Sequence, residues 1–253
     1  MVSQINASSW APGYRELPAP TGTGAAVVCR WIRVTPPGSD WSTTEVLPDG
    51  CTDLIWQQGR GAFFAGPDTG PAPAVTPPGT VLVGVRFKPG AGGPALGIPL
   101  AEVRDQRIDV AELAPWLARK LPAELNPEEI FRRITHISGQ LTSEAPPDPV
   151  VRHVTALLVV GQVGVAELAR AAAISERQLL RRFDAAVGYG PKMLHRVMRF
   201  CRVVDAMYSG RGHLDIAAVA SQTGYADQAH LTREVSRMAG VTPAALGRRL
   251  AAD

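Results

Sequence analysis

Basic and amide side chains occupy one face of a short segment that follows Ser175. At about 100° per residue, the side chains on that face are Arg177, Gln178, Arg181 and Arg182. The opposite face is apolar and carries Leu179, Leu180 and Phe183. Ser175 is a preferred helix N-cap, and Gln178, three residues later, completes a capping-box pattern. The pattern predicts an amphipathic helix that presents guanidinium groups to solvent.

A second segment, which follows Asp227, repeats this design. Asp227 can cap the helix, and the predicted buried stripe is Leu231, Val235 and Met238. The predicted outer face carries Ala229, His230, Arg233 and Arg237. In the major groove of duplex DNA, arginine pairs with guanine and glutamine with adenine, and each good pair discriminates by about 1–3 kcal/mol. The two faces therefore predict the reading of base edges in duplex DNA.

An outward row of arginines on an isolated helix is more often a solvated surface, and capping alone would explain Gln178. An internal repeat favours the DNA-binding interpretation. Val165, Leu168, Ala169 and Ile174 recur 51 residues later as Ile216, Val219, Ala220 and Tyr225, and Gly188 and Pro191 recur 52 residues later as Gly240 and Pro243. The repeat predicts a helix-turn-helix unit that is present twice.

One long helix is predicted between the two units, from Pro191 to Tyr208. At about 1.5 Å per residue it spans about 27 Å, so it can hold two recognition helices in successive major grooves, about 34 Å apart. The basic side chains predicted to face outward are Lys192, Arg196, Arg199 and Arg202. We expect Lys192 and Arg196 to contact DNA phosphates.

Charge divides the chain of 253 residues into two halves. Residues 1–145 hold 12 Lys and Arg against 14 Asp and Glu, whereas residues 146–253 hold 14 against 9. The basic half is the one that carries the repeat, as a polyanion partner requires. No apolar run approaches the roughly 20 residues of a membrane helix, and residues 1–6 do not resemble a signal peptide. A cytoplasmic protein without a membrane partner is expected.

The pattern of breakers and periodicity predicts an α+β fold with two domains. Residues 1–108 are predicted to be a β-rich domain, 109–149 a helical linker, and 150–253 the double helix-turn-helix domain. Thr43–Leu47 and Thr52–Trp56 are expected to form a hairpin around residues 48–50. Val81–Phe87 reads as a half-buried strand, and a helix is expected to begin at Asn126-Pro127. A linker is expected over residues 143–149.

Two features of the first 149 residues bear on ligands and partners. Side chains that can line a small-molecule pocket are Arg30, Trp31, Arg33, Trp41, Trp56 and Arg86. Of these, Trp31, Arg33, Trp56 and Arg86 are the ligand-binding candidates, although buried aromatics are more often plain core. Arg86 and Lys88 on one strand face favour an acidic effector. The apolar side chains of residues 109–142 can serve a homodimer or pack on their own β region.

The sequence offers no catalytic or metal-binding constellation. The first histidine is His136, after the β-rich region, so neither a metal nor another cofactor is expected. The cysteines, Cys29, Cys51 and Cys201, are too few for a disulfide framework. Two alternatives stay open: a redox-sensing regulator that uses Cys51, and a cupin-type enzyme tethered to a helical domain.

Residues 150–250 resemble the DNA-binding domain of the AraC/XylS family of transcription regulators. The resemblance is carried by residues 165–169, 175–183, 187–192, 216–220, 224–234 and 240–243, in order and with the family's spacing. It implies base-reading positions at Arg177, Leu180 and Arg181 in the first unit and at Gln228, Ala229, His230 and Arg233 in the second. RNA polymerase is a further partner that such a regulator can have.

Three departures from the family pattern concern packing. Ala173 stands where the first turn often has glycine, Val235 where an aromatic residue is usual, and residues 245–247 where the family often has an aromatic and a basic residue. The complete set of expected DNA-contacting residues is Ser175, Arg177, Gln178, Leu180, Arg181, Arg182, Lys192, Arg196, Asp227, Gln228, Ala229, His230, Thr232, Arg233 and Arg237.

The N-terminal region resembles, less specifically, the cupin-like sensor domains of one branch of these regulators. The resemblance is carried by residues 47–55, 84–91 and 96–100. It implies a β-rich barrel that binds a small-molecule effector, followed by helices that support dimerisation.

Overall fold

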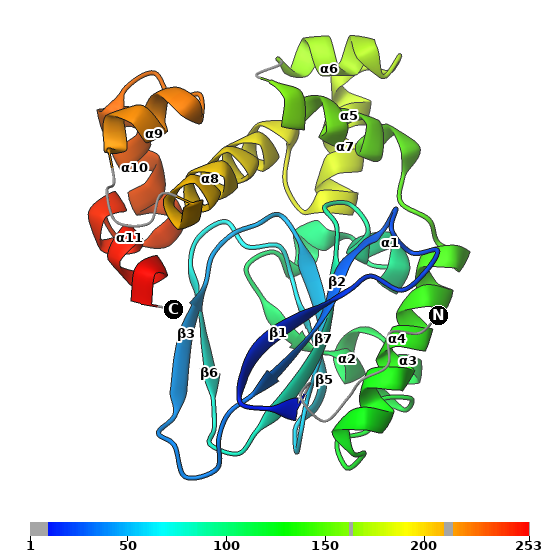
Figure 1. The fold of residues 1–253 in the computed structure, drawn as a ribbon. Coiled ribbons are helices and arrows are strands. Elements are labelled where there is room, and N and C mark those ends of the chain that lie inside the picture. The colour runs from blue at the N-terminus through cyan, green and yellow to red at the C-terminus, as the bar shows by residue number, and fades with distance from the viewer. Residues whose placement is uncertain (1–9, 162–163, 210–214, 253) are drawn as a thin grey trace.

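A computed structural model describes residues 10–161, 164–209 and 215–252 of the chain. The first residues, on which the expectation of no signal peptide rests, lie outside this part. Figure 1 shows a β-rich N-terminal region with one long helix along its side and a group of helices above it. The expected α+β fold, β-rich first and all-α second, is confirmed.

Six strands form one antiparallel sheet in the order β1-β2-β7-β4-β5-β8, and β3 and β6 form a second sheet of two strands. The bounds of the strands are β1 Gly13–Pro18, β2 Val27–Val34, β3 Ser42–Val46, β4 Thr52–Gln57, β5 Gly61–Ala65, β6 Ala72–Thr76, β7 Val81–Phe87 and β8 Arg107–Asp109.

The hairpin expected between residues 43–47 and 52–56 is wrong. Strand β3 pairs with β6, from Ser42 opposite Thr76 to Val46 opposite Ala72, while β4 pairs with β5 and β7. Residues 47–51 therefore cross from the smaller sheet to the larger one. A Cβ atom at Gly50 would lie 3.0 Å from Cδ1 of Leu194 in the C-terminal region, so this crossing packs against a distant helix.

Strand β7 lies between β2 and β4 and is buried on both faces, not on one as expected. Val83 and Val85 are fully buried in the larger core, and Leu82 on the other face is only 9% exposed. A smaller cluster around Trp31 and Ile55 covers that second face. A central strand in a sheet covered on both sides loses the simple alternation of polar and apolar residues.

Helix α4 covers the face of the sheet that holds the larger core. Its N-cap, Asn126, accepts a hydrogen bond from the backbone nitrogen of Glu129 at 2.9 Å, as the expected start of this helix requires. The helix extends to Glu144, so the linker begins two residues later than expected. The helical elements of this region are α1 Gly92–Leu96, the 3-10 helix η2 Leu100–Val103, α2 Val110–Leu113, α3 Pro115–Ala118 and α4 Pro127–Glu144.

The C-terminal region is helical throughout its described residues and has a core of its own. Its helices are α5 Pro149–Val160, α6 Val165–Ala171, α7 Glu176–Val187, α8 Pro191–Ser209, α9 Ile216–Gln222, α10 Gln228–Ala239 and α11 Pro243–Ala252. The expected long helix is α8, and it runs between a group of helices around α7 and another around α10 (Figure 1). None of the helices described has the length and apolar composition needed to cross a membrane.

Candidate nucleic-acid interface

The first unit consists of α6, a tight turn and α7. The hydroxyl of Ser175 accepts a hydrogen bond from the backbone nitrogen of Gln178 at 3.2 Å, and Oε1 of Gln178 accepts one from the backbone nitrogen of Ser175 at 3.0 Å. This capping box is the predicted one. At the other end, Gly188 closes the helix with φ of 88°, a conformation that glycine adopts without steric cost.

The outer face of α7 is basic and open to solvent. Arg177, Arg181 and Arg182 are exposed, whereas Leu179 and Phe183 are fully buried. Leu180 is 44% exposed, so the expectation that it joins the buried stripe is wrong. It lies three residues after Arg177 and therefore shares the arginines' face. This outward position agrees with the one that the family resemblance implies.

The second unit, with α9, a turn and α10, repeats this construction. Oδ1 of Asp227 accepts a hydrogen bond from the backbone nitrogen of His230 at 2.6 Å and caps α10 as predicted. The exposed side chains are Gln228, Ala229, Arg233 and Arg237, and the fully buried ones are Leu231, Val235 and Met238. His230 packs edge-on against Tyr225, with ring centroids 5.2 Å apart, and is half-buried, as is Thr232. Two residues expected to contact DNA, His230 and Thr232, are thus partly covered by the second unit.

Arg181 and Arg233 occupy equivalent positions in the two units. Each lies six residues after its N-cap, Ser175 or Asp227, and each is exposed. Both helices have 12 residues and end at a left-handed glycine, Gly188 or Gly240. The repeat is therefore a repeat of geometry, and one guanidinium stands at the same place on each recognition helix.

The turn of the first unit contains an alanine in a left-handed conformation. Ala173 has φ of 53°, and its counterpart 51 residues later is Gly224, with φ of 78°. A Cβ atom is strained in this conformation, whereas glycine adopts it freely. The departure from the family pattern noted at Ala173 thus falls where the backbone needs glycine most.

Helix α8 does not present all its basic side chains to solvent. Lys192 is exposed, but Arg196 donates from Nε and Nη2 to the carboxylate of Glu234 on α10, at 2.8 and 2.9 Å. Arg199 is 4% exposed, and its Cζ lies 4.1 Å from the ring centroid of Tyr225. The expectation that Arg199 faces outward is wrong, because α10 and the turn before it cover that side of α8.

The network around Glu234 escaped sequence reasoning. Burial opposes ionisation of this carboxyl, but hydrogen bonds and positive charge from Arg196 and Arg199 outweigh it and hold the pKa of Glu234 below its usual range. The one local signal is that Glu234 follows the outward Arg233, which places its side chain toward α8. The partner of Glu234 lies 38 residues earlier in the chain, and local periodicity does not find such a partner.

Arg182 also has a partner within the chain. Its Nη1 lies 2.7 Å from Oδ2 of Asp148, the N-cap of α5. Asp148 also accepts from the backbone nitrogen of Val150 at 2.8 Å. This one carboxylate both caps α5 and contacts α7 at the entrance to the C-terminal region.

One loop of the N-terminal region touches the ends of both recognition helices. A Cβ atom at Gly188 would lie 2.6 Å from Cγ of Pro67, and one at Gly240 would lie 3.2 Å from Cγ of Pro71. We call residues 66–71 the bridging loop. Asp68 fixes this loop by accepting two hydrogen bonds from Arg107, at 2.8 and 2.6 Å. Both units are thus in contact with the same short segment of the β-rich region.

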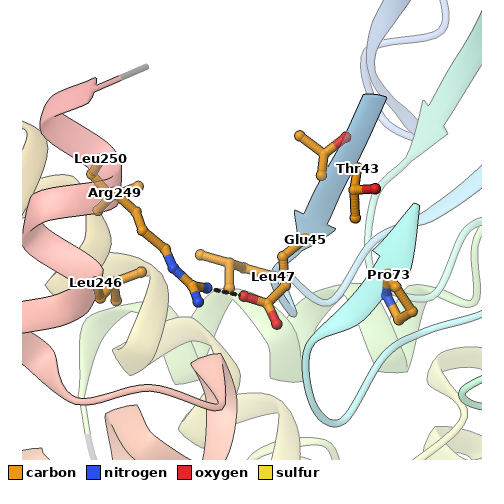
Figure 2. Close-up of a pocket in the computed structure, with 8 residues that line it drawn as sticks. Thr43, Glu45, Leu47, Pro73, Leu246, Arg249 and Leu250 are labelled. Atoms are coloured by element: carbon orange, nitrogen blue, oxygen red, sulfur yellow. Dashed lines mark hydrogen bonds and ion pairs between the residues drawn. The ribbon is translucent and has the colours of Figure 1, made fainter. Parts of the chain in front are cut away.

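Two further contacts join the regions. Nη1 of Arg104 donates to the carbonyl oxygen of Gly188 at 3.3 Å. On the other side, Arg249 of α11 forms an ion pair with Glu45 of β3. Figure 2 shows this pair across a cavity of about 480 Å³, with Thr43 and Pro73 on the β side and Leu246 and Leu250 on α11.

The four ligand-binding candidates do not form one pocket. Nε1 of Trp31 donates to Asp53 at 2.6 Å, and Arg86 shares that carboxylate at 3.4 Å on the same face of the sheet. Trp56 is fully buried in the core on the opposite face and donates from Nε1 to the carbonyl oxygen of Pro122 at 2.9 Å. Arg33 donates to the hydroxyl of Thr44. Trp56 is therefore separated from the other three.

Arg86 is surrounded by acidic side chains. Besides Asp53, Glu16 lies 3.5 Å and Asp49 3.6 Å from its Nη1. Burial disfavours the charged form of Arg86, but the carboxylates outweigh burial and raise its pKa. Because three carboxylates already surround this guanidinium, its surroundings do not favour an acidic effector, contrary to the expectation from Arg86 and Lys88.

The cysteines are free thiols, and burial keeps them protonated at neutral pH. Burial raises the pKa of Cys29 and of Cys201 to about 12 and that of Cys51 well above its usual range. The thiolate is the reactive form, so the redox alternative based on Cys51 lacks the activated group it needs. The described residues contain no group of three or more potential metal ligands.

Two family models and one curated relative match parts of the chain. Residues 168–249 match a model described as a helix-turn-helix domain, and residues 18–109 match one described as a domain of unknown function (DUF6597). A Streptomyces antibioticus protein named as an AraC-like transcription regulator is 38% identical over 79 residues, which is 31% of this chain. The chain spans only 25% of the length of that relative.

Two solved structures are similar at low identity. One, of a Rhodopseudomonas palustris protein described as an AraC family transcriptional regulator, has 21% identity and a TM-score of 0.37, and covers 41% of this chain and 98% of that one. The other, ToxT from Vibrio cholerae, has 10% identity and a TM-score of 0.43, and covers 84% and 98%. The segment matched by the helix-turn-helix model contains both recognition helices.

Proposed function

We propose that this chain, whose residues 168–249 match a helix-turn-helix domain model, is a sequence-specific DNA-binding transcription regulator of the AraC type. The observation that carries the proposal is the pair of equivalent, exposed guanidinium groups of Arg181 and Arg233, each on the solvent face of a capped helix. Arginine in this setting pairs bidentately with guanine in the major groove.

Base reading by α7 involves Arg177, Leu180 and Arg181. Leu180 has no hydrogen-bonding group, so its contribution is apolar contact, such as with a thymine methyl. In α10, Gln228 and Arg233 supply hydrogen bonds, and Ala229 allows close approach. Ser175 and Gln178 satisfy each other in the capping box, so their part is to hold the start of α7.

Phosphate contacts come from basic side chains that have no carboxylate partner among the described residues. Lys192 at the start of α8 and Arg237 on α10 are both exposed. Arg196 differs from the expectation, because two of its three nitrogens, Nε and Nη2, donate to Glu234. We assign it to positioning α10 on α8. Arg182, paired with Asp148, has a similar role at α7.

We also propose that the N-terminal region binds a small-molecule effector and transmits its state to the two units. Support comes from the bridging loop, which contacts the ends of both recognition helices, and from the Arg104 and Glu45 contacts. A cupin-like barrel, a homodimer, a contact with RNA polymerase and a cytoplasmic location stay predictions.

Selection of bound fragments from genomic DNA by the full chain tests the regulator proposal. Arg181→Ala and Arg233→Ala are each expected to lose at least about 1 kcal/mol on the selected site and little on random DNA. Arg119→Ala, which removes an exposed arginine of the N-terminal region, is the matched control and is expected to bind like the wild type. Equal losses on the selected site and on random DNA would refute base reading by these arginines.

A further inference from the structure

A groove of about 1540 Å³ lies between the turn that follows β1 and the outer side of α4. Its lining includes Thr23 from the turn, Arg30 from β2, and Phe131, Thr135 and His136 from α4. None of these residues belongs to the DNA-binding units or to the contacts between the two regions. The groove therefore needs an explanation of its own.

Arg30, which lines the groove, is a buried cation without a carboxylate partner. The residue is 2% exposed, and Nε donates to the carbonyl oxygen of Pro18 at 3.0 Å. Its Cζ lies 5.1 Å from the ring centroid of Phe131. In the part of the chain that the structure describes, no carboxylate lies within 4.0 Å of this guanidinium, whereas Arg86 and Arg107 both have such partners.

A buried arginine in this state is costly. Burial without a partner disfavours the charged form, and accordingly the pKa of Arg30 is lowered, whereas that of Arg107 is raised. Nη1 and Nη2 make no hydrogen bond to a described residue. Residues 1–9 contain no aspartate or glutamate, so side chains of that segment cannot supply the missing anion.

Thr135 provides a second, independent observation. Its hydroxyl oxygen is buried and has no hydrogen-bond partner in the described part of the chain, although the residue lines the same groove. Buried hydroxyl groups in folded proteins are nearly always satisfied. A cationic donor and an unsatisfied hydroxyl thus line one groove, beside the apolar ring of Phe131.

We infer that this groove binds a small organic carboxylate, held by the guanidinium of Arg30 and the hydroxyl of Thr135, with its apolar body along Phe131. A guanidinium presents two parallel N–H groups that match the two oxygens of a carboxylate. The other charged residues along the groove, Arg132, Glu128 and Glu144, add a net charge of −1, so the lining with Arg30 is neutral overall. A singly charged ligand is therefore a better match than a phosphate dianion.

The groove reaches the connection to the C-terminal region. Glu144 lines it and ends α4, and four residues later Asp148 caps α5 and contacts Arg182 on α7. A ligand along α4 can thus influence the first recognition helix. This regulatory role depends on the proposed DNA-binding function, but binding of the carboxylate does not.

Calorimetric titration of the full chain with benzoate and octanoate, and with uncharged benzamide, tests the inference. At least one of the two carboxylates is expected to bind saturably, and benzamide is not. Arg30→Met should weaken carboxylate binding roughly tenfold or more, and Thr135→Val by several fold, because each removes a hydrogen bond to a charged group. Arg119→Met, at an exposed position outside the groove, is the control and should bind like the wild type.

Saturable binding of neither carboxylate to the wild type, or equal affinity of the wild type and Arg30→Met, overturns the inference. If Arg30→Met does not fold, Thr135→Val decides, and unchanged affinity in that variant overturns it as well. A homodimer that buries this groove, seen as a concentration-dependent mass with no carboxylate binding, also excludes it. Since no DNA is present, failure here leaves the regulator proposal untouched, and DNA binding measured separately tests that proposal.

Discussion

The carboxylate of Glu234 accepts hydrogen bonds from Nε and Nη2 of Arg196, at 2.8 and 2.9 Å, and so joins α10 to α8. Arg199 approaches the same carboxylate to 3.7 Å while its guanidinium covers the ring of Tyr225. The side chain of Glu234 is only 12% exposed. The packing of α10 against α8 is therefore stabilised by a largely buried charge network.

Replacement of Glu234 by glutamine is expected to lower the free energy of unfolding by about 1–3 kcal/mol, because hydrogen bonds to a charged group are lost in a poorly solvated place. Denaturant unfolding of the full chain measures the change. Glu124→Gln, at an exposed position in the N-terminal region, is the control and should change stability by less than about 0.5 kcal/mol. Equal stability of the two variants would show that the network adds nothing.

The same network predicts a pH dependence. The pKa of Glu234 is lower in the folded chain than in the unfolded chain, so its contribution is full above the ordinary glutamate pKa of about 4.3 and is lost as the pH falls through the folded value. The stability advantage of the wild type over Glu234→Gln should therefore shrink on acidification from pH 7. A constant difference between pH 7 and the acid range would contradict this assignment.

Ala173→Gly is expected to stabilise the protein by roughly 0.5–1 kcal/mol. The left-handed conformation at φ of 53° strains the alanine, and removing the Cβ atom releases more than the added chain entropy of glycine costs. Gly224→Ala, at the equivalent turn, should destabilise by a similar amount. Thermal unfolding of both variants measures the effects, and the same sign in both would contradict the argument.

Lys192→Ala should weaken binding to all DNA sequences by a similar factor. Lys192 is exposed at the start of α8, where a phosphate contact carries no sequence information. The slope of log affinity against log salt concentration should fall in magnitude by about 1. Titrations of specific and random duplexes at several salt concentrations measure this slope, and a loss confined to the specific site would assign Lys192 to base reading.

Asp68→Asn should lower the free energy of unfolding by about 1–3 kcal/mol, because Asp68 is 8% exposed and accepts two hydrogen bonds from Arg107. Since Asp68 anchors the bridging loop, hydrogen exchange should rise near the ends of both α7 and α10. Exchange that rises around β8 alone would show that the loop keeps its position without this pair.

Local chemistry made much of the C-terminal region predictable. Ser175 and Asp227 cap their helices as expected, and both C-terminal glycines are left-handed. These features depend on residues within one or two turns of each other, which periodicity and capping rules describe. The same local rules identified the exposed arginines at Arg181 and Arg233.

Long-range partners were not predictable from spacing. The helical spacing predicted an outward Arg199, but α10 packs over this side chain and buries it. The strand Ser42–Val46 pairs with a strand about 30 residues later and not with the next strand in the sequence. Arg30 likewise gave no signal of being buried, because its burial comes from α4, a hundred residues later. In each case the decisive contact joins segments that the sequence separates widely.

Through the bridging loop, the β-rich region contacts both helices that we propose to read DNA. Pro67 and Pro71, four residues apart, abut the terminal glycines of α7 and α10, so the loop adds a second connection between these two helices, besides α8. A chain shortened to its last hundred residues would keep the base-reading side chains but would lose the contacts of the bridging loop. We expect the shortened chain to bind operators with a wider range of spacings between the two segments that α7 and α10 read.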